Sequence, residues 1–395
     1  MHKFLFILML TFSSAYAFAD VDATFSMWLK GLKNEARAQG ISEQTIDSTF
    51  EDARFIPSII TLDRAQPEFI TTFSSYISKR VTHSRVLAGR LQLKKHKALL
   101  EEIELQYGIP KTILVAFWGL ETNYGGNKGD YGLPSALMTL AYEGRRAAFF
   151  RSQLMDMMLI VDSGHNNIDA MRGSWAGAMG HMQFMPSTFL AYATDADADG
   201  RSNIWRSLPD AFSSAANYLS RIGWQQGVPV ALEVKLPSGF EYYQAQLGFR
   251  QNSKGWAALG VIQADGTPLP EIGNTAVLLP QGWQGPAFLV TNNFDVVMQW
   301  NRSVNYALSV SHLADQLQAD NPIVYGLRTE QAGITFNQAW ALQARLNEMG
   351  YNSGKPDGFP GIKTKQAIRS YQLRHKLPAD GYPSVALFEK LVSGK

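Results

Sequence analysis

The sequence contains no cysteine, which excludes disulfide bonds, free thiols and a lipid-modified cysteine. Its 36 basic residues nearly balance its 34 acidic residues, and no stretch carries five or more like charges. The chain therefore lacks the electrostatic footprint of a nucleic-acid-binding protein. No apolar run approaches the ~20 residues of a transmembrane helix, so we expect no membrane span. What remains, 46% hydrophobic and 18% charged over 395 residues, is an ordinary globular composition with room for two or three domains.

The N-terminus has the pattern of a secretory signal peptide. A basic start precedes an apolar run from Phe4 to Leu10, and small residues lead to Ala17 and Ala19 before Asp20. We expect cleavage after Ala19, with Ala17 as the alternative, rather than a short buried N-terminal helix. Together with the missing cysteine, this pattern predicts a soluble, non-lipidated protein in the periplasm.

The spacing of apolar residues changes along the chain. Repeats at three and four, such as Phe25, Trp28 and Leu32, predict helices on both sides of Gly108, and helical pattern returns from Phe294 to Leu317. Short apolar runs separated by Pro, Gly and Asn predict a small β-rich insert. We expect a mainly α (α+β) fold with these parts: signal peptide 1–19, catalytic region 20–320 with a β-rich insert about 228–290, linker 321–333, and C-terminal domain 334–395.

The C-terminal segment contains an internal half-repeat. Helical runs that include Leu342 and Ile368 each lead to an Asp-Gly turn, at Asp357 and at Asp380. A third helix from Val385 to Leu391 follows. This pattern predicts a small three-helix domain.

The strongest chemical motif ends at a glutamate. Pro110 suits the first turn of a helix, and Glu121 follows Phe117 by four residues on the same apolar stripe. Burial and the negative end of the helix dipole both raise the pKa of such a carboxyl, and a neutral carboxylic acid is what a general acid for a glycosidic oxygen requires. A buried glutamate hydrogen-bonded into the structure is the alternative.

Two further segments are candidates for binding. Residues 172–187 combine three glycines with polar and aromatic residues, so a ligand can approach the backbone, and Ser174 and Gln183 can hydrogen-bond sugar groups. Turn chemistry explains the glycines equally well. His181 lies in this loop, but it has no second ligand at metal-binding spacing, so we expect it not to bind a metal.

Residues 195–210 begin like a calcium-binding loop. Asp195, Asp197 and Asp199 alternate, and a glycine stands at the sixth position for the sharp turn. The twelfth position is Arg206 rather than Glu, so Asp210 is needed as the missing ligand. A structural cation site or a solvated acidic turn fits this pattern.

From about Phe25 to Leu317 these motifs resemble the membrane-bound lytic transglycosylase B family in order and spacing. The matching segments are Glu121–Gly125, Gly144–Arg146, Gly173–Ser187, the acidic loop with Asp210, and Trp300–Ser303 with Tyr306. The resemblance implies a core like goose-type lysozyme, with an α-helical N-terminal region and a small β region. The C-terminal segment resembles the three-helix peptidoglycan-binding domain type 1, although Phe359-Pro360-Gly361 departs from the commoner order of that turn.

The resemblance also implies roles for individual residues. Glu121 is the implied catalytic acid and base. The implied sugar-binding residues are Tyr124, Arg145, Arg146, Ser174, Gln183, Tyr218, Trp300, Asn301 and Tyr306. The implied ligands of a structural Ca²⁺ are Asp195, Asp197, Asp199, the Arg201 carbonyl and Asp210, and no cofactor is implied for catalysis. Trp300 stands where family members often have Tyr, so stacking persists but a phenolic hydrogen bond is lost.

The implied reaction cleaves peptidoglycan glycan strands between N-acetylmuramic acid and N-acetylglucosamine with formation of a 1,6-anhydro end, and Glu121 acts first as acid and then as base. An intramolecular hydroxyl has a high effective concentration, so one carboxylate is enough. A lysozyme-like hydrolase with Asp162 or Asp169 as a second carboxylate is one alternative. A non-catalytic wall-binding scaffold is the other.

Overall fold

The computed structural model describes residues 12–65, 71–143, 146–325 and 333–393. These residues are mainly helical with a few short strands, which confirms the predicted fold class. They form two compact units, each built from segments distant in sequence. The first unit joins Met1–Ala65 to Gly125–Ala215, and the second joins Gln66–Tyr124 to Ala216–Lys395.

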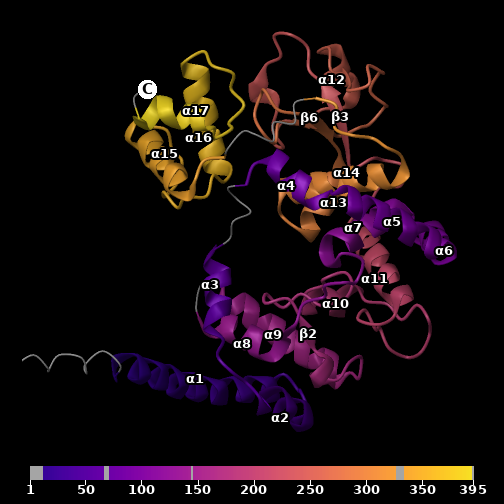
Figure 1. The fold of residues 1–395 in the computed structure, drawn as a ribbon, viewed down its shortest axis with the longest axis vertical. Helices are drawn as coiled ribbons and strands as arrows, with labels where there is room; N and C mark the ends of the chain where they lie inside the picture. The colour runs from indigo at the N-terminus through magenta and orange to yellow at the C-terminus, as the bar shows by residue number, and fades with distance from the viewer. Residues whose placement is uncertain (1–11, 66–70, 144–145, 326–332, 394–395) are drawn as a thin grey trace, which may run out of the picture. The chain divides into compact units, whose positions relative to one another are not determined.

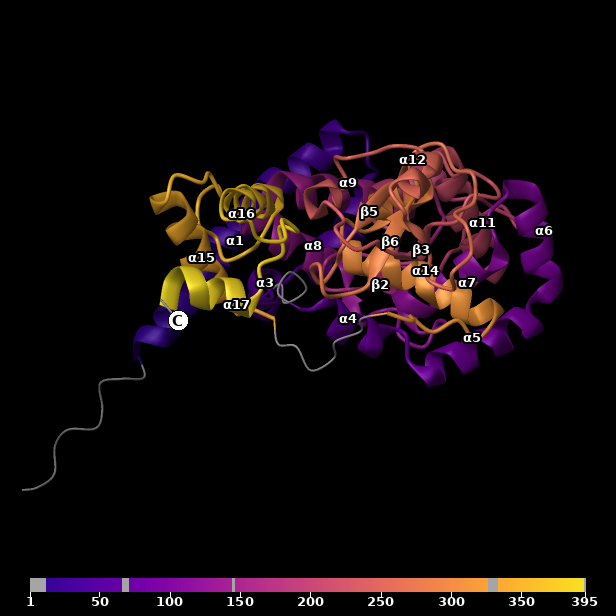
Figure 2. The ribbon, with the colours of Figure 1, turned by 90° about the horizontal axis from the view of Figure 1, so that it is seen from above.

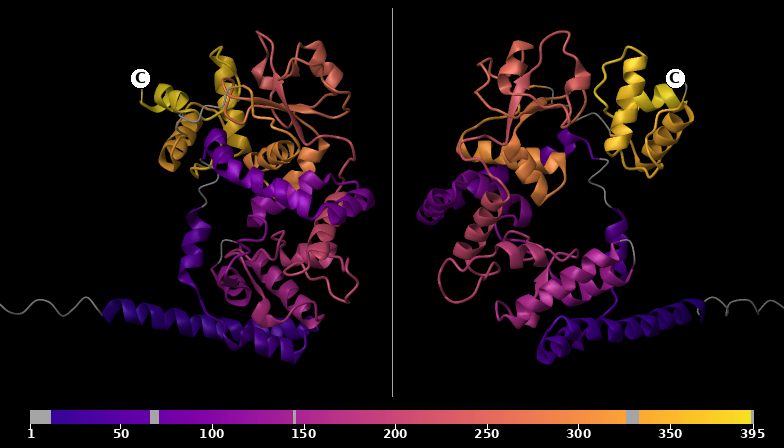
Figure 3. Two further views of the ribbon diagram at one scale, coloured as in Figure 1. Left: turned by 45° about the vertical axis from the view of Figure 1, so that its right-hand side comes forward. Right: turned by 180° about the vertical axis from the view of Figure 1, so that it is seen from behind.

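The first unit is a group of helices with one small strand pair (Figure 1). Its elements are α1 (Phe12–Ala38), α2 (Glu43–Glu51), α3 (Pro57–Ala65), β1 (Tyr131–Gly132), α8 (Leu133–Tyr142), α9 (Ala147–Asp162), β2 (Arg172–Gly173), α10 (Pro186–Tyr192) and the first part of α11 (Leu208–Arg221). α1 is one long helix, indigo in Figure 3. Leu137 on α8 and Leu154 on α9 are fully buried, and the two helices pack against each other because each has an apolar face.

The predicted signal peptide is only partly described. Its apolar run falls in residues 1–11, which lie outside the described residues. α1 begins at Phe12 and continues past Ala19 to Ala38. No helix in the described part of the chain has both the length and the apolar character needed to cross a membrane.

The second unit combines a helical layer with the β-rich segment. Its helices before the C-terminal domain are α4 (Phe73–Arg80), α5 (His83–Lys95), α6 (Lys97–Tyr107), α7 (Lys111–Thr122), the end of α11, α12 (Ser253–Ala258), α13 (Asn292–Trp300) and α14 (Val304–Gln318). α7 is buried along almost its whole length and packs against α5 and α14. A helix that is apolar on every side needs neighbours on every side, which explains its central place.

Four antiparallel strands form the sheet of the second unit, in the order β4-β3-β6-β5. They are β3 (Ala231–Lys235), β4 (Ile262–Gln263), β5 (Ala276–Leu278) and β6 (Ala287–Val290). Trp256 is fully buried in the core beneath them, together with Val277 and Leu289. The sheet lies beside α14 in Figures 1 and 2. The Ser311 hydroxyl on α14 donates to the Ala231 carbonyl on β3 at 3.5 Å.

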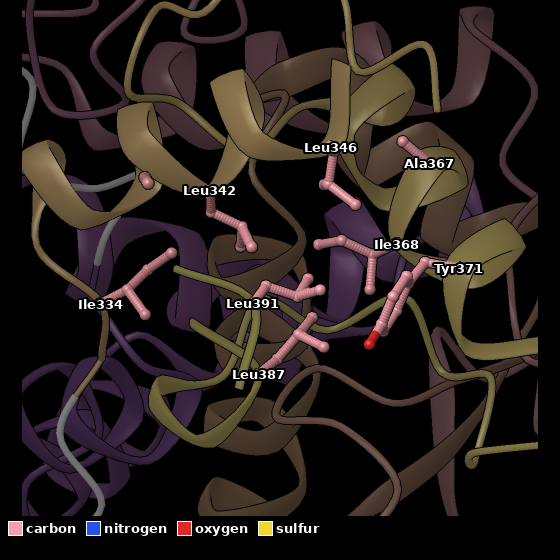
Figure 4. Packing of buried hydrophobic residues seen from close by; sticks show 9 residues of the cluster. Ile334, Leu342, Leu346, Ala367, Ile368, Tyr371, Leu387 and Leu391 are labelled. Atoms are coloured by element: carbon pink, nitrogen blue, oxygen red, sulfur yellow. The ribbon is translucent and has the colours of Figure 1, made fainter. Parts of the chain in front are cut away.

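The C-terminal helices are α15 (Phe336–Glu348), α16 (Ile362–Arg374) and α17 (Val385–Phe388), the last continued by a π-helical turn, Glu389–Ser393. Leu342, Ile368 and Leu391 point toward one another in a core of their own (Figure 4). The half-repeat predicted from the Asp-Gly turns has a structural counterpart in two buried glutamines. Gln343 accepts hydrogen bonds from the Asp357 and Gly358 amides, and Gln372 accepts one from the Gly381 amide.

Candidate active site

Glu121 lies in the last turn of α7, and two donors converge on one of its oxygens. The Trp300 indole Nε1–H donates to Oε1 at 3.0 Å, and the Tyr306 hydroxyl donates to the same atom. The side chain is half-buried. α7 ends directly after it, because Asn123 and Tyr124 both adopt left-handed backbone conformations, with φ of 51° and 60°. The carboxyl is therefore held at the tip of a buried helix.

A break between two helices delivers both donors. α13 ends at Trp300, and Asn301 continues in an extended conformation. The Ser303 hydroxyl then accepts the Tyr306 amide at 3.3 Å and so caps α14. Trp300 and Tyr306 thus flank a short non-helical segment, whereas the sequence pattern predicted helix from Phe294 to Leu317.

The Tyr306 hydroxyl keeps its proton and acts as a hydrogen-bond donor. Burial and the neighbouring Glu121 carboxyl raise the pKa of Tyr306 well above its usual value, and Arg80 on α4 opposes this effect only in part. The phenol is therefore neutral at pH 7 and donates its hydrogen to Glu121.

Trp300 also belongs to an aromatic group. Its ring centre lies 4.4 Å from the ring centre of Phe117 and 5.3 Å from that of Tyr218. The Tyr218 hydroxyl reaches the Gln299 carbonyl at 3.5 Å. Four of the predicted site residues are therefore brought together here: Glu121, Tyr218, Trp300 and Tyr306. The sequence did not predict the indole hydrogen bond, because a tryptophan after a helical run carries no local sign of its partner.

Tyr124 and Asn301 lie close to this group in sequence. The Tyr124 hydroxyl donates to the Arg85 carbonyl at 2.7 Å, and its ring packs edge-on against Trp118. Burial raises the pKa of Tyr124 well above its usual value. Asn301 is half-buried, and its carbonyl accepts the Ser303 amide at 2.8 Å. The hydroxyl of Tyr124 is thus engaged with the protein backbone.

The first unit carries the predicted loop residues. The Ser174 hydroxyl oxygen accepts the Ala176 and Ala178 amides at 3.3 and 3.0 Å, so its own hydrogen is what it can offer a ligand. Gln183 donates from Nε2 to the Lys128 and Gly180 carbonyls, which leaves its Oε1 to accept. Glycine is required beside Ser174, because a Cβ at residue 173 would lie 2.1 Å from the Ala178 carbonyl oxygen.

His181 and Arg146 complete the predicted polar residues of the first unit. Burial, helped by the charge of Lys128, lowers the pKa of His181 to about 4. Arg146 pairs with the buried Asp63 at 3.0 Å, and its guanidinium lies 4.8 Å from the Phe150 ring centre. Arg145 lies outside the described residues.

Three carboxylates of the acidic loop converge. Oxygens of Asp195, Asp197 and Asp210 lie within 4.8 Å of one another, and Asp210 is fully buried in the first turn of α11. Asp199 instead accepts the Arg201 amide at 2.9 Å. The Ser207 hydroxyl, which the sequence did not single out, donates to Asp197 at 2.6 Å. Clustered carboxylate oxygens are ligands that suit Ca²⁺.

The two carboxylates considered as a second base are both exposed. Asp162 accepts hydrogen bonds from the Thr45 hydroxyl at 2.7 Å and from the Ser42 side chain, which caps α2. These hydrogen bonds, that from Ser42 first, lower the pKa of Asp162. Asp169 lies in the short 3-10 turn Ile168–Ala170.

Known proteins resemble this chain over most of its length. Residues 24–315 match the transglycosylase SLT domain family, and residues 338–391 match a peptidoglycan binding domain family. Membrane-bound lytic murein transglycosylase B of Escherichia coli (strain K12) is 33% identical over 255 residues, 60% of this chain. The matched region spans 65% of that relative's length.

Solved structures are similar as well. SltB3 from Pseudomonas aeruginosa, in complex with NAG-anhNAM-pentapeptide, is 39% identical, with 93% of this chain and 99% of that chain covered and a TM-score of 0.90. Escherichia coli Slt35, in complex with calcium, is 27% identical, with 73% and 92% covered and a TM-score of 0.63. Because the family match extends over far more than half of its residues, the chain belongs to the transglycosylase SLT domain family.

Proposed function

We propose that this protein is a lytic transglycosylase. It cleaves the β-1,4 bond between N-acetylmuramic acid and N-acetylglucosamine in peptidoglycan and leaves a 1,6-anhydromuramoyl end. The observation that carries the proposal is the Glu121 carboxyl, half-buried at the end of α7 with two donors on Oε1, in a chain of the transglycosylase SLT domain family. The complex of SltB3 with NAG-anhNAM-pentapeptide supports the same substrate class.

In the proposed reaction the Glu121 carboxyl first donates one proton and then accepts one. Glu121 protonates the glycosidic oxygen as its bond to C1 of N-acetylmuramic acid breaks, and the acetamido oxygen of that sugar stabilises the positive centre. The Glu121 carboxylate then takes the proton of the 6-hydroxyl while O6 forms a bond to C1. The glutamate ends as it began, and no water is consumed, because the attacking hydroxyl is already held beside C1.

In this proposal Ser174 and Gln183 hold the sugar through atoms that remain available beside their internal hydrogen bonds. Ser174 offers its hydroxyl hydrogen to the acetamido oxygen, and Gln183 offers its Oε1 to a sugar hydroxyl or amide. Further proposed binding residues are Tyr124, Arg145, Arg146, Tyr218, Trp300, Asn301 and Tyr306. Arg145 and Arg146 suit carboxylates of the peptide or lactyl groups.

Hydrolysis is the less favoured reaction. It needs a second carboxylate that activates water. Asp162 is a poor candidate for this base. The hydrogen bonds that it accepts from Ser42 and Thr45 fix it at the N-terminus of α2 and lower its pKa, which makes the carboxylate a weaker base. Mass spectrometry of the released muropeptides separates the two reactions, because a hydrolysis product is heavier by one water than an anhydro product.

The central test is Glu121→Gln. We expect turnover of purified peptidoglycan to fall by at least about 10³-fold, because the amide cannot deliver a proton. Circular dichroism and co-sedimentation with the wall should match the unchanged protein. Turnover at the original rate would refute the role of Glu121, and products of hydrolytic mass from the unchanged protein would refute the proposed reaction.

We also propose that the acidic loop binds a structural Ca²⁺ through Asp195, Asp197, Asp199, the Arg201 carbonyl and Asp210. The convergence of three carboxylates and the calcium complex of Slt35 support this site. Calcium should raise the melting temperature of the protein, and Asp197→Asn should remove most of that increase, because binding to the native state alone stabilises it. Equal melting temperatures with calcium and with chelator would contradict the site.

The location follows from the substrate. We propose that the chain is exported to the periplasm by residues 1–19 and that residues 334–395 bind the wall. The match of residues 338–391 to a peptidoglycan binding domain family supports the second part. N-terminal sequencing of the protein from a periplasmic extract tests the first part, with Asp20 as the expected first residue.

A further inference from the structure

We propose that Trp300 is a positioning residue that, with Tyr306, fixes the catalytic proton of Glu121 on Oε2 and makes that single oxygen both the acid and the base. This inference rests on the proposed function, because it concerns the glutamate assigned to the reaction. It starts from one geometric fact: both donors address Oε1.

The chemistry of the donors decides where the proton can reside. An indole N–H donates and cannot accept, so the oxygen facing Trp300 has to be an acceptor in every protonation state of Glu121. A neutral carboxyl has one carbonyl oxygen, which accepts well, and one hydroxyl oxygen. Two donors on Oε1 select it as the carbonyl oxygen. The hydrogen of the neutral acid is therefore on Oε2.

Packing keeps the indole in this position. Trp300 is the last residue of α13, and its ring lies against Phe117 from the same helix as Glu121 and against Tyr218. Tyr306 is anchored separately by the Ser303 cap of α14. The donors therefore hold the carboxyl from two anchoring points, one on each side of the helix break.

Both donors keep their hydrogens through the reaction. Among the described residues, the titratable and charged neighbours that act on the pKa of Tyr306 are Glu121 itself and, from α4, Tyr76 and Arg80. Tyr306 stays protonated, and the indole has no proton to lose in water. Oε2 gives its proton to the glycosidic oxygen, and the same oxygen receives the proton of the 6-hydroxyl. The carboxyl does not have to rotate between the two steps.

Kinetics of Trp300→Phe test the positioning role. The ring is kept and the donor is lost, so we expect kcat to fall about 10- to 100-fold, the worth of a hydrogen bond to a charged group, with KM changed less than about twofold. The alkaline limb of the kcat–pH profile should shift to higher pH, because the carboxylate loses a stabilising donor. A raised KM with unchanged kcat would overturn the proposal in favour of sugar stacking.

A matched control is available in Trp224→Phe. The Trp224 Nε1–H is buried and has no hydrogen-bond partner among the described residues, so its loss removes an indole without removing a hydrogen bond. Its kcat and pH profile should equal those of the unchanged protein. An equal fall in kcat for both variants would overturn the assignment to Trp300.

A measurement without turnover separates this proposal from the proposed function. In ¹⁵N NMR of the unchanged protein, the Trp300 indole signal should shift with pH as Glu121 titrates, and Glu121→Gln should abolish the titration. This readout remains usable if Trp300→Phe fails to fold. A signal indifferent to pH and to Glu121→Gln would overturn the proposal even with full activity, whereas turnover by Glu121→Gln would remove the proposed function. Neutron diffraction of the neutral form should place the deuteron on Oε2, and a deuteron on Oε1 would refute the proposal.

Discussion

At the scale of single residues, the end of α7 depends on two glycines that leave room for the Tyr124 phenol ring. A Cβ at Gly89 would lie 2.4 Å from the Tyr124 hydroxyl oxygen and from a Leu317 methyl, and a Cβ at Gly119 would lie 2.8 Å from the same phenol. The Tyr124 ring thus joins α5 to the end of α7, one turn from Glu121. Loss of this packing would loosen the helix end that carries the carboxyl.

We therefore expect Gly89→Ala to lower the free energy of unfolding by about 2 kcal/mol, because overpacking a buried contact costs more than a helical alanine contributes. Urea denaturation measures the change. Gly31→Ala is the matched control, since Gly31 also lies inside a helix but an added Cβ would have no atom of the described residues within 4 Å. That variant should be as stable as the unchanged protein or more stable, and equal losses at both positions would exclude the packing explanation.

The local sequence pattern predicted the position of Glu121 in its helix well but did not predict its hydrogen-bond partners. The apolar stripe and the glycine after the motif placed the glutamate at the end of a buried helix, as the structure shows. The sequence predicts a raised pKa for Glu121 from burial and the helix dipole alone. Two hydrogen-bond donors favour the charged form and act in the opposite direction. Their contribution was outside the reach of a local pattern, because contacts between distant segments leave no periodicity.

At the scale of elements, the break between α13 and α14 is the main departure from the predicted helices. Apolar spacing is continuous across residues 294–317, so periodicity alone predicts helix throughout. The structure breaks at 301–303, where Ser303 provides a capping hydroxyl. The capping preference of serine is visible in the sequence, but serine is also tolerated inside helices. Tertiary contacts of Trp300 and Tyr306 decide between the two.

The half-repeat of the C-terminal domain was predictable, because both turns carry the same Asp-Gly signal. Its glutamines link helix to turn: Gln343 also donates to Asp357 at 2.8 Å, and Gln372 donates to Asp380 at 2.7 Å. Both glutamine side chains are buried. Removal of Gln343 leaves the buried Gly358 amide without its acceptor, and removal of Gln372 leaves the buried Gly381 amide without its acceptor.

We expect Gln343→Ala to destabilise residues 334–393 by about 2–3 kcal/mol, since buried polar groups lose their hydrogen bonds. Hydrogen exchange on the full chain measures this locally, and exchange in α15 and α16 should become faster. Gln366→Ala, an exposed position on α16, should leave exchange unchanged. Unchanged protection in Gln343→Ala would show that the glutamine does not hold the turn.

At the scale of the whole molecule, the spacing of apolar residues predicted the fold class, but the order of the segments along the chain did not reveal the two compact units. The sequence predicts one continuous catalytic region, 20–320, and its boundaries and those of the linker remain predictions. Contacts instead join residues 66–124 to 216–395 and residues 1–65 to 125–215. Such pairing of distant segments depends on which apolar faces meet, and one sequence does not specify this.

Removal of the C-terminal domain should separate wall binding from catalysis. A chain ending after Tyr325 keeps the Glu233 carboxylate bound to the Val324 and Tyr325 amides, at 2.8 and 2.7 Å. We expect it to lose most co-sedimentation with intact peptidoglycan but to cleave short soluble glycans at the original rate. Full-length Glu121→Gln is the complementary control, which should bind the wall without cleaving it. Undiminished binding by the shortened chain would place wall affinity in the catalytic region.

The distance along the chain between Glu121 and its donors has a consequence for biosynthesis. Trp300 and Tyr306 follow the glutamate by 179 and 185 residues. During synthesis from the N-terminus, the glutamate emerges long before either donor exists. A nascent chain, or a fragment truncated before Trp300, therefore carries the glutamate without the two donors that position its carboxyl. In the proposed reaction, the acid therefore becomes complete only after most of the chain has been made.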